Sequence, residues 1–200
     1  VGPHPGQPLL FLGSPAGLDP TPAWMGLLGP QNSLLFGDTV QGVGDVNNDG
    51  YDDVMVNDPG EPYALPDPLN APFGQYYRSE GSVYLYLGGP QGLGSSWVWS
   101  ATQPESHFGV SMAAAGDVDG DGYGDVLVGT PGYDIDGSTY GPNCREEAVY
   151  LYKGTATGLE SQPSWVQRPS IAFGCFGFAL DSAGDVNGDG YDDVIISAFA

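Results

Sequence analysis

The chain has 200 residues, of which 25 are acidic and only four are lysine or arginine, so its formal net charge is −21. So few cations cannot neutralise a phosphate backbone, which argues against nucleic acid or an anionic membrane surface as a partner. The 33 glycines and 18 prolines lie between short apolar runs, and 40% of the residues are hydrophobic. This composition is typical of an all-β fold rich in turns and not of a disordered chain.

The first apolar run, LLFLGSPAGL at residues 9–18, is typical of a strand followed by a turn, and Trp24 marks a further strand. Two later runs resemble it: SVYLYLGGPQGL at residues 82–93 and AVYLYKGTATGL at residues 148–159. Each later run is also followed by a tryptophan-bearing segment. The recurrence indicates an internal repeat.

A nine-residue pattern occurs three times, as DVNNDGYDD, DVDGDGYGD and DVNGDGYDD, and its copies start at Asp45, Asp117 and Asp185. Positions one, three, five and nine carry side-chain oxygens, position six is glycine, and position seven is a tyrosine whose carbonyl could add another oxygen. Calcium takes roughly six to eight oxygen ligands, which alternate residues of a tight loop can direct to one point. The pattern predicts three calcium sites with these ligands: Asp45, Asn47, Asp49, Tyr51, Asp53, Asp117, Asp119, Asp121, Tyr123, Asp125, Asp185, Asn187, Asp189, Tyr191 and Asp193.

The alternative interpretation of each copy is a plain turn, because aspartate, asparagine and glycine all favour turns. Three copies in one register favour metal binding. An EF-hand is excluded, since it needs glutamate at position twelve, where this chain has Val56, Val128 and Ile196. The β-branched residues after each copy indicate a loop between two strands. Because one short loop supplies all the protein ligands, we expect a structural and not a catalytic metal, whose binding is coupled to folding.

The repeat unit is larger than the loop. A Phe-Gly pair stands eight or nine residues before each copy, and the copies recur with a period of about 70 residues. The unit contains a small-residue strand, the loop, a β-branched strand, the VYLY-type strand and the tryptophan segment. Four short antiparallel strands per unit predict the blades of a β-propeller.

These motifs resemble the FG-GAP repeat of integrin α-subunit β-propellers. The first half of the motif is Phe36-Gly37, Phe108-Gly109 and Phe176-Gly177, and the second half is partly kept as NDP, GTP and SAF. The family's calcium loop matches all three nonapeptides. The resemblance implies a seven-bladed propeller, of which we expect this chain to be a part. A six-bladed ring made by two chains is the alternative.

The blade pattern divides the chain into four parts. We expect residues 1–30 to form the outer half of a blade, residues 31–100 and 101–170 to form one blade each, and residues 171–200 to form the inner half of another. Strand direction alternates within a blade, so the inserts after the second strands should lie opposite the metal loops. Cys144 and Cys175 fall on that insert face, where a disulfide and two free thiols both remain open.

The inserts are rich in aromatic residues, which favour interfaces. Their candidate partner-binding residues are Tyr63, Phe73, Tyr76, Tyr77, Arg78, Tyr133 and Tyr140. The resemblance implies ligand binding at the corresponding face. The alternative is that these side chains only fasten the long inserts to the propeller.

We therefore expect a calcium-stabilised propeller module of a secreted or cell-surface protein, which mediates adhesion or assembly through a protein partner. No catalytic constellation is visible in the sequence, so we expect no enzymatic activity. Two alternatives stay open. One is the non-catalytic propeller of a secreted hydrolase or lyase, and the other is a self-assembling surface or filament protein.

Overall fold

The computed structural model describes residues 6–26, 36–58, 81–94, 96–100, 108–131, 147–169 and 176–198. All the regular secondary structure in these ranges is β-strand, and every paired strand is antiparallel. The predicted all-β class with antiparallel sheets is therefore confirmed. Within these ranges no helix is long and apolar enough to cross a membrane.

Two sheets have four strands each, and in both the first three strands follow chain order. The first consists of β5 (Val40–Gly44), β6 (Asp53–Asp58), β7 (Ser82–Tyr86) and β8 (Ser96–Ser100). The second has the order β9-β10-β11-β14, with a small hairpin of β12 and β13 inserted before its last strand. Its strands are β9 (Ser111–Gly116), β10 (Asp125–Thr130), β11 (Ala148–Tyr152), β12 (Gly154–Thr155), β13 (Gly158–Leu159) and β14 (Trp165–Gln167).

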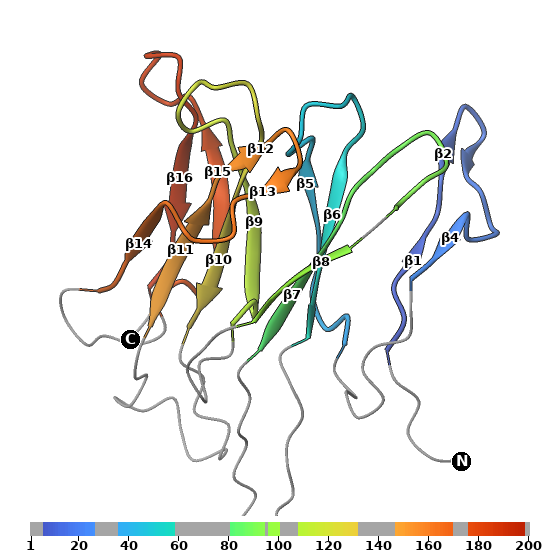
Figure 1. Ribbon diagram of the computed structural model, residues 1–200, viewed down its shortest axis with the longest axis horizontal. Helices are drawn as coiled ribbons and strands as arrows, with labels where there is room; N and C mark the ends of the chain where they lie inside the picture. Colours follow the sequence, from blue (N-terminus) through green and yellow to red (C-terminus); the bar gives the residue numbers. More distant parts are fainter. Residues whose placement is uncertain are drawn as a thin grey trace, which may run out of the picture.

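Two-stranded sheets flank this pair, so that the sheets follow one another in an open row (Figure 1). At one end β1 pairs with β4, and β2 pairs with β3 in a hairpin between them. At the other end β15 pairs with β16. The strand β9 lies between β5 and β15, so the first strands of successive sheets are neighbours. The bounds are β1 (Leu9–Leu10), β2 (Gly13–Ser14), β3 (Gly17–Leu18), β4 (Trp24–Met25), β15 (Leu180–Gly184) and β16 (Asp193–Ile196).

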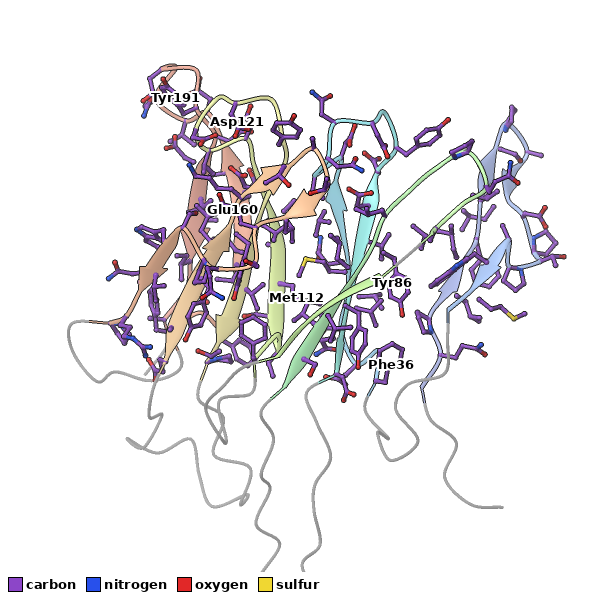
Figure 2. All side chains as sticks on the ribbon, viewed as in Figure 1. Phe36, Tyr86, Met112, Asp121, Glu160 and Tyr191 are labelled. Atoms are coloured by element: carbon purple, nitrogen blue, oxygen red, sulfur yellow. The ribbon has the colours of Figure 1, made fainter. Side chains whose placement is uncertain are left out.

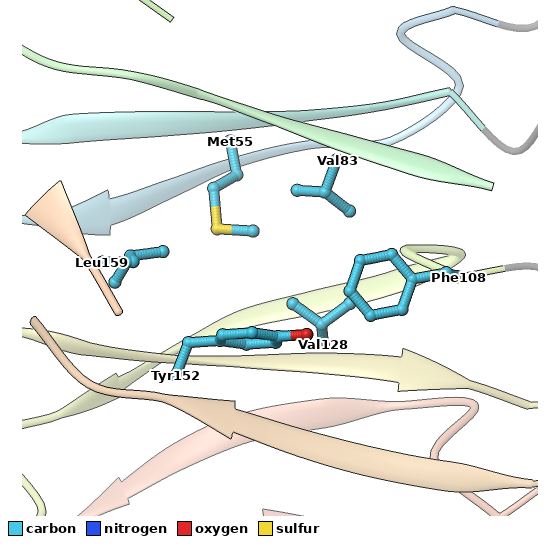
Figure 3. A pocket seen from close by; sticks show the side chains of 6 residues that line it. All are labelled: Met55, Val83, Phe108, Val128, Tyr152 and Leu159. Carbon is cyan, nitrogen blue, oxygen red and sulfur yellow. The ribbon is translucent and has the colours of Figure 1, made fainter. Parts of the chain in front are cut away.

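The core consists of apolar layers between successive sheets. In the layer between the two four-stranded sheets, Met55 and Val83 face Val128 and Tyr152, with Phe108 and Leu159 at either side (Figure 3). Burial raises the pKa of Tyr152 to about 12, so its phenol stays neutral at physiological pH. The contact is apolar packing and offers no chemistry.

The Phe-Gly pairs lie in the turns before β5, β9 and β15. The glycine N–H donates to the backbone carbonyl at the start of the second half of the motif, as in Gly109 to Gly129 at 3.1 Å. Gly37 bonds in the same way to Asn57 at 2.8 Å, and Gly177 to Ser197 at 2.9 Å. A φ of +86° at Gly109 explains the glycine, because other residues are strained there. The two halves of the motif, about 20 residues apart in sequence, thus hold the first two strands together.

Candidate metal centres

The three nonapeptides form the connections β5–β6, β9–β10 and β15–β16, all along the same side of the row, at the top in Figure 1. Asp121 and Tyr191 lie on this side, whereas Phe36 lies towards the opposite one (Figure 2). We call the three connections loop one, loop two and loop three. Each loop therefore joins the first two strands of a different sheet.

The position-one aspartate is the centre around which each loop turns. In loop one, Asp45 Oδ1 accepts the N–H of Asp49 at 3.0 Å and Oδ2 accepts the N–H of Gly50 at 2.7 Å. Asp117 and Asp185 make the same two bonds in their own loops. Backbone hydrogen bonds, chiefly from Gly190, lower the pKa of Asp185. This carboxylate is therefore ionised and directed into its loop before any metal binds.

The position-nine aspartate joins the loop to the rest of its sheet. Asp53 is fully buried, with Oδ2 accepting the N–H of Val46 at 2.9 Å and Oδ1 that of Gly88 at 2.7 Å. Asp125 is equally buried and bonds to Val118 at 3.0 Å and to Gly154 at 2.9 Å. Burial raises the pKa of both carboxyl groups. In loop three Asp193 makes the first of these bonds, to Val186.

The remaining positions complete each loop. The position-five carboxylates accept the N–H of the following tyrosine, at 3.0 Å from Tyr51 and at 3.0 Å from Tyr123. Tyr51 and Tyr191, at position seven of loops one and three, are about half exposed to solvent. In loop one, position three also bonds within the loop, since the Asn47 amide donates to Asp49 Oδ2 at 3.0 Å.

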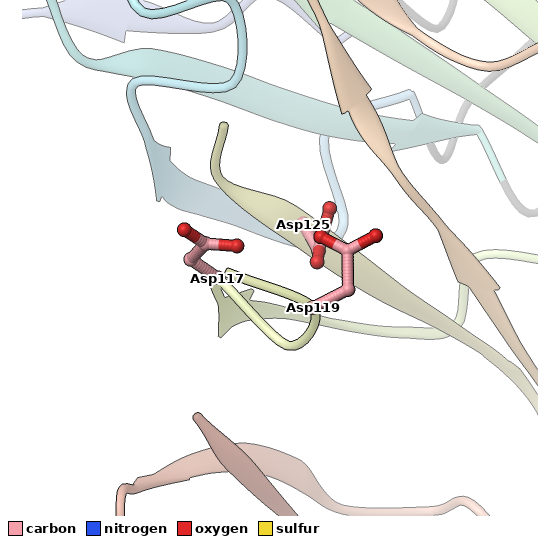
Figure 4. Close-up of side chains that lie close together, drawn as sticks. All are labelled: Asp117, Asp119 and Asp125. Carbon is pink, nitrogen blue, oxygen red and sulfur yellow. The ribbon is translucent and has the colours of Figure 1, made fainter. Parts of the chain in front are cut away.

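Loop two shows most directly that a cation would fit. Asp117, Asp119 and Asp125 each bring one carboxylate oxygen to within 4.8 Å of the others (Figure 4). Asp119 Oδ1 is buried and has no hydrogen-bond partner among the described residues. Three converging carboxylates with one oxygen left unpartnered are the donor set that a hard cation prefers. Each oxygen that already accepts an N–H keeps a further lone pair for a metal.

Lys153, which follows β11, also contacts loop two, and the sequence analysis did not identify this contact. Its Nζ lies 2.5 Å from Asp119 Oδ2, and this hydrogen bond lowers the pKa of Asp119 while raising that of Lys153. Lys153 lies 36 residues after Asp117, the first residue of the loop, and becomes the loop's neighbour only when β11 pairs with β10. The signal in the sequence was the unmatched charge in AVYLYKGTATGL, where the earlier repeat has leucine.

All the predicted metal ligands lie within the described loops, and their role as ligands stays a prediction. The candidate partner-binding residues and the two cysteines lie outside the described residues. These are Tyr63, Phe73, Tyr76, Tyr77, Arg78, Tyr133, Tyr140, Cys144 and Cys175.

Comparison with known proteins agrees with the repeated motifs. Residues 108–152 match the FG-GAP repeat. The chain is 35% identical to human integrin alpha-IIb over 175 residues, and 36% identical to mouse integrin alpha-8 over 177 residues. Each alignment covers 86% of this chain but only 16% and 15% of the relative, so the chain spans a small part of their length. A human integrin alpha-7 is 32% identical over 79% of the chain and 12% of the relative. The chain belongs to the FG-GAP repeat family and resembles its integrin alpha members.

Proposed function

We propose that this chain is a calcium-stabilised β-propeller portion of a secreted or cell-surface protein, where it binds protein partners in adhesion or assembly. The observation that carries the proposal is the set of three acidic loops, one for each of three successive sheets, along one side of the row. The similarity to integrin alpha chains supports it. The proposed module is not an enzyme and does not act on nucleic acid.

Positions one, three, five and nine of each loop, with the position-seven carbonyl, would hold the ion. Calcium would supply positive charge to a group of carboxylates that otherwise repel one another. The chain's own part is to orient those groups. The position-one aspartate folds each loop, and in loops one and two the buried position-nine aspartate connects it to the end of the third strand, at Gly88 and Gly154. A bound ion in either of these loops would therefore brace three strands of one sheet.

Equilibrium dialysis against calcium, with bound metal counted by mass spectrometry, tests this proposal. We expect three ions per chain, and two when Asp121→Ala removes one ligand of loop two. Asp19→Ala is the matched control, because it removes an exposed carboxylate that belongs to none of the loops and should leave three bound ions. No bound calcium, or three ions bound by the Asp121→Ala variant, would contradict the proposal.

The protein-binding role is assigned to the inserts after β6 and β10. Aromatic and arginine side chains contribute disproportionately to protein interfaces, and the first insert carries Tyr76, Tyr77 and Arg78 together. Replacing these three by alanine should weaken capture of a protein partner from a cell-surface extract while the melting temperature stays nearly unchanged. A large loss of stability would instead favour a role in fastening the insert.

The division into blades is part of the same proposal. Residues 31–100 and 101–170 would be complete blades, residues 1–30 the outer half of one and residues 171–200 the inner half of another. The two-stranded sheets β1–β4 and β15–β16 at opposite ends of the row also support self-assembly as a second candidate function, since their edge strands could pair with a second chain. Light scattering distinguishes the two, because a monodisperse monomer in calcium would contradict self-assembly.

A further inference from the structure

Loop two differs from loop one in the residue that precedes the glycine bonded to the position-nine aspartate. Gly154 donates to Asp125 at 2.9 Å, as Gly88 donates to Asp53 at 2.7 Å, so the two glycines are structurally equivalent. The residue before Gly154 is Lys153, whereas Leu87 stands before Gly88. Lys153 extends to loop two and pairs with Asp119. Leu87 instead packs against the apolar layer between the sheets.

Asp119, the partner of Lys153, is also the ligand position at which loop two differs from loops one and three. Position three is asparagine in loops one and three, at Asn47 and Asn187, but aspartate in loop two. Among positions one, three, five and nine, loop two therefore has four carboxylates where the others have three. Lys153 adds one positive charge next to the additional carboxylate. With Lys153 included, the net charge of these four positions in loop two is then the same as in loops one and three.

The geometry allows both charges to act on a metal. The lysine binds Oδ2 of Asp119 and leaves the buried Oδ1 without a partner. The side chains of both residues are 32% exposed, so the pair is partly solvated and can rearrange when an ion binds. An ammonium group this close to a ligand opposes a divalent cation electrostatically.

We propose that Lys153 sets the calcium affinity of loop two by neutralising the additional carboxylate of Asp119, so that loop two binds calcium about as tightly as loops one and three. This inference rests on the proposed calcium binding. In such loops affinity follows the number of ligand charges. Loss of Lys153 alone would make loop two the tightest site, and loss of Asp119 alone would make it the weakest.

The experiment uses the full chain with ¹⁵N-labelled glycine, titrated with calcium and followed by NMR. Position six of each loop is a glycine, so Gly50, Gly122 and Gly190 report the three sites separately. Lys153→Leu should lower the calcium concentration that half-saturates Gly122 by about five- to tenfold, and Asp119→Asn should raise it by a similar factor. The double variant, which matches loop one at position three and at the residue before the glycine, should return it close to the original value. Gly50 and Gly190 should not change by more than about twofold in any of these variants.

Two results would overturn the inference. In the first, calcium shifts the NMR signals of all three glycines in the unaltered chain, but Lys153→Leu leaves the calcium concentration that half-saturates the Gly122 signal unchanged or raises it. In the second, calcium shifts none of the three glycine signals, and this result would contradict the proposed calcium binding on which the inference rests. If Lys153→Leu does not fold, Lys153→Met keeps the length of the side chain and removes only its charge. Opposite effects of the two single variants are not expected from a lysine that merely stabilises the fold, because both would then weaken binding.

Discussion

The layers between the sheets and the loops at their end are held by different forces. Between the sheets, residues such as Leu127 and Val128 are buried among apolar side chains. In the loops, short backbone segments fold around carboxylates, and the position-one and position-five groups are exposed to solvent or partly so. Apolar burial stabilises the sheets in any ionic condition, whereas clustered carboxylates need a counter-charge. The comparison predicts that the sheets tolerate the removal of metal and that the loops do not.

The largest effect should come from the apolar layers and should not depend on metal. Leu127 is fully buried between β9–β11 and the last sheet, so Leu127→Ala should reduce the free energy of unfolding by about 2–5 kcal/mol. Chemical denaturation in calcium and in EGTA checks this. If Leu127→Ala lowered the free energy of unfolding in calcium but not in EGTA, the packing of the sheets would depend on the loops, and the contrast between the two regions would be wrong.

A loop variant should show the opposite dependence. Asp121→Ala removes a proposed ligand, so in calcium at 100 times its dissociation constant the chain should lose about 2.7 kcal/mol. In EGTA the loss should be below about 1 kcal/mol, the value of the single hydrogen bond from Tyr123. Equal losses in the two buffers would show that loop two is only a turn.

Neighbouring loops are also connected to each other. The N–H of position eight donates to the position-one carbonyl of the preceding loop, from Gly124 to Asp45 at 3.1 Å and from Asp192 to Asp117 at 3.1 Å. Only Asp192 adds a side-chain contact, in which its Oδ2 accepts the N–H of Asp117 at 2.9 Å. Loop three therefore supports loop two more strongly than loop two supports loop one.

The smallest effect tests this contact. Asp192→Ala keeps the backbone bond and removes the carboxylate, which should cost about 1 kcal/mol. Asp52→Ala is its matched control, since Asp52 is the exposed position-eight residue of loop one and its side chain makes no such bond within the described ranges. Its effect should stay within about 0.5 kcal/mol. Equal losses measured by urea unfolding would remove the distinction between the loops.

The loops and strands could be predicted because each depends on local sequence. The aspartates of loop one bond to backbone groups of the same nine residues, so their spacing alone predicts the loop. The alternation in Val83-Tyr84-Leu85 alone indicates a strand. The contacts of Lys153 and Asp192 could not be predicted, because they form between segments that only tertiary packing brings together. The same holds for the second bond of the position-nine aspartates, whose donor lies on the connection after the third strand.

The central claim is that calcium stabilises this chain through its three loops, and thermal unfolding in calcium and in EGTA tests it most directly. We predict that saturating calcium raises the melting temperature by about 10 °C or more, and that replacing Asp49, Asp121 and Asp189 together by alanine abolishes the increase. An unchanged melting temperature in calcium, or an equal increase in the triple variant, would contradict the account.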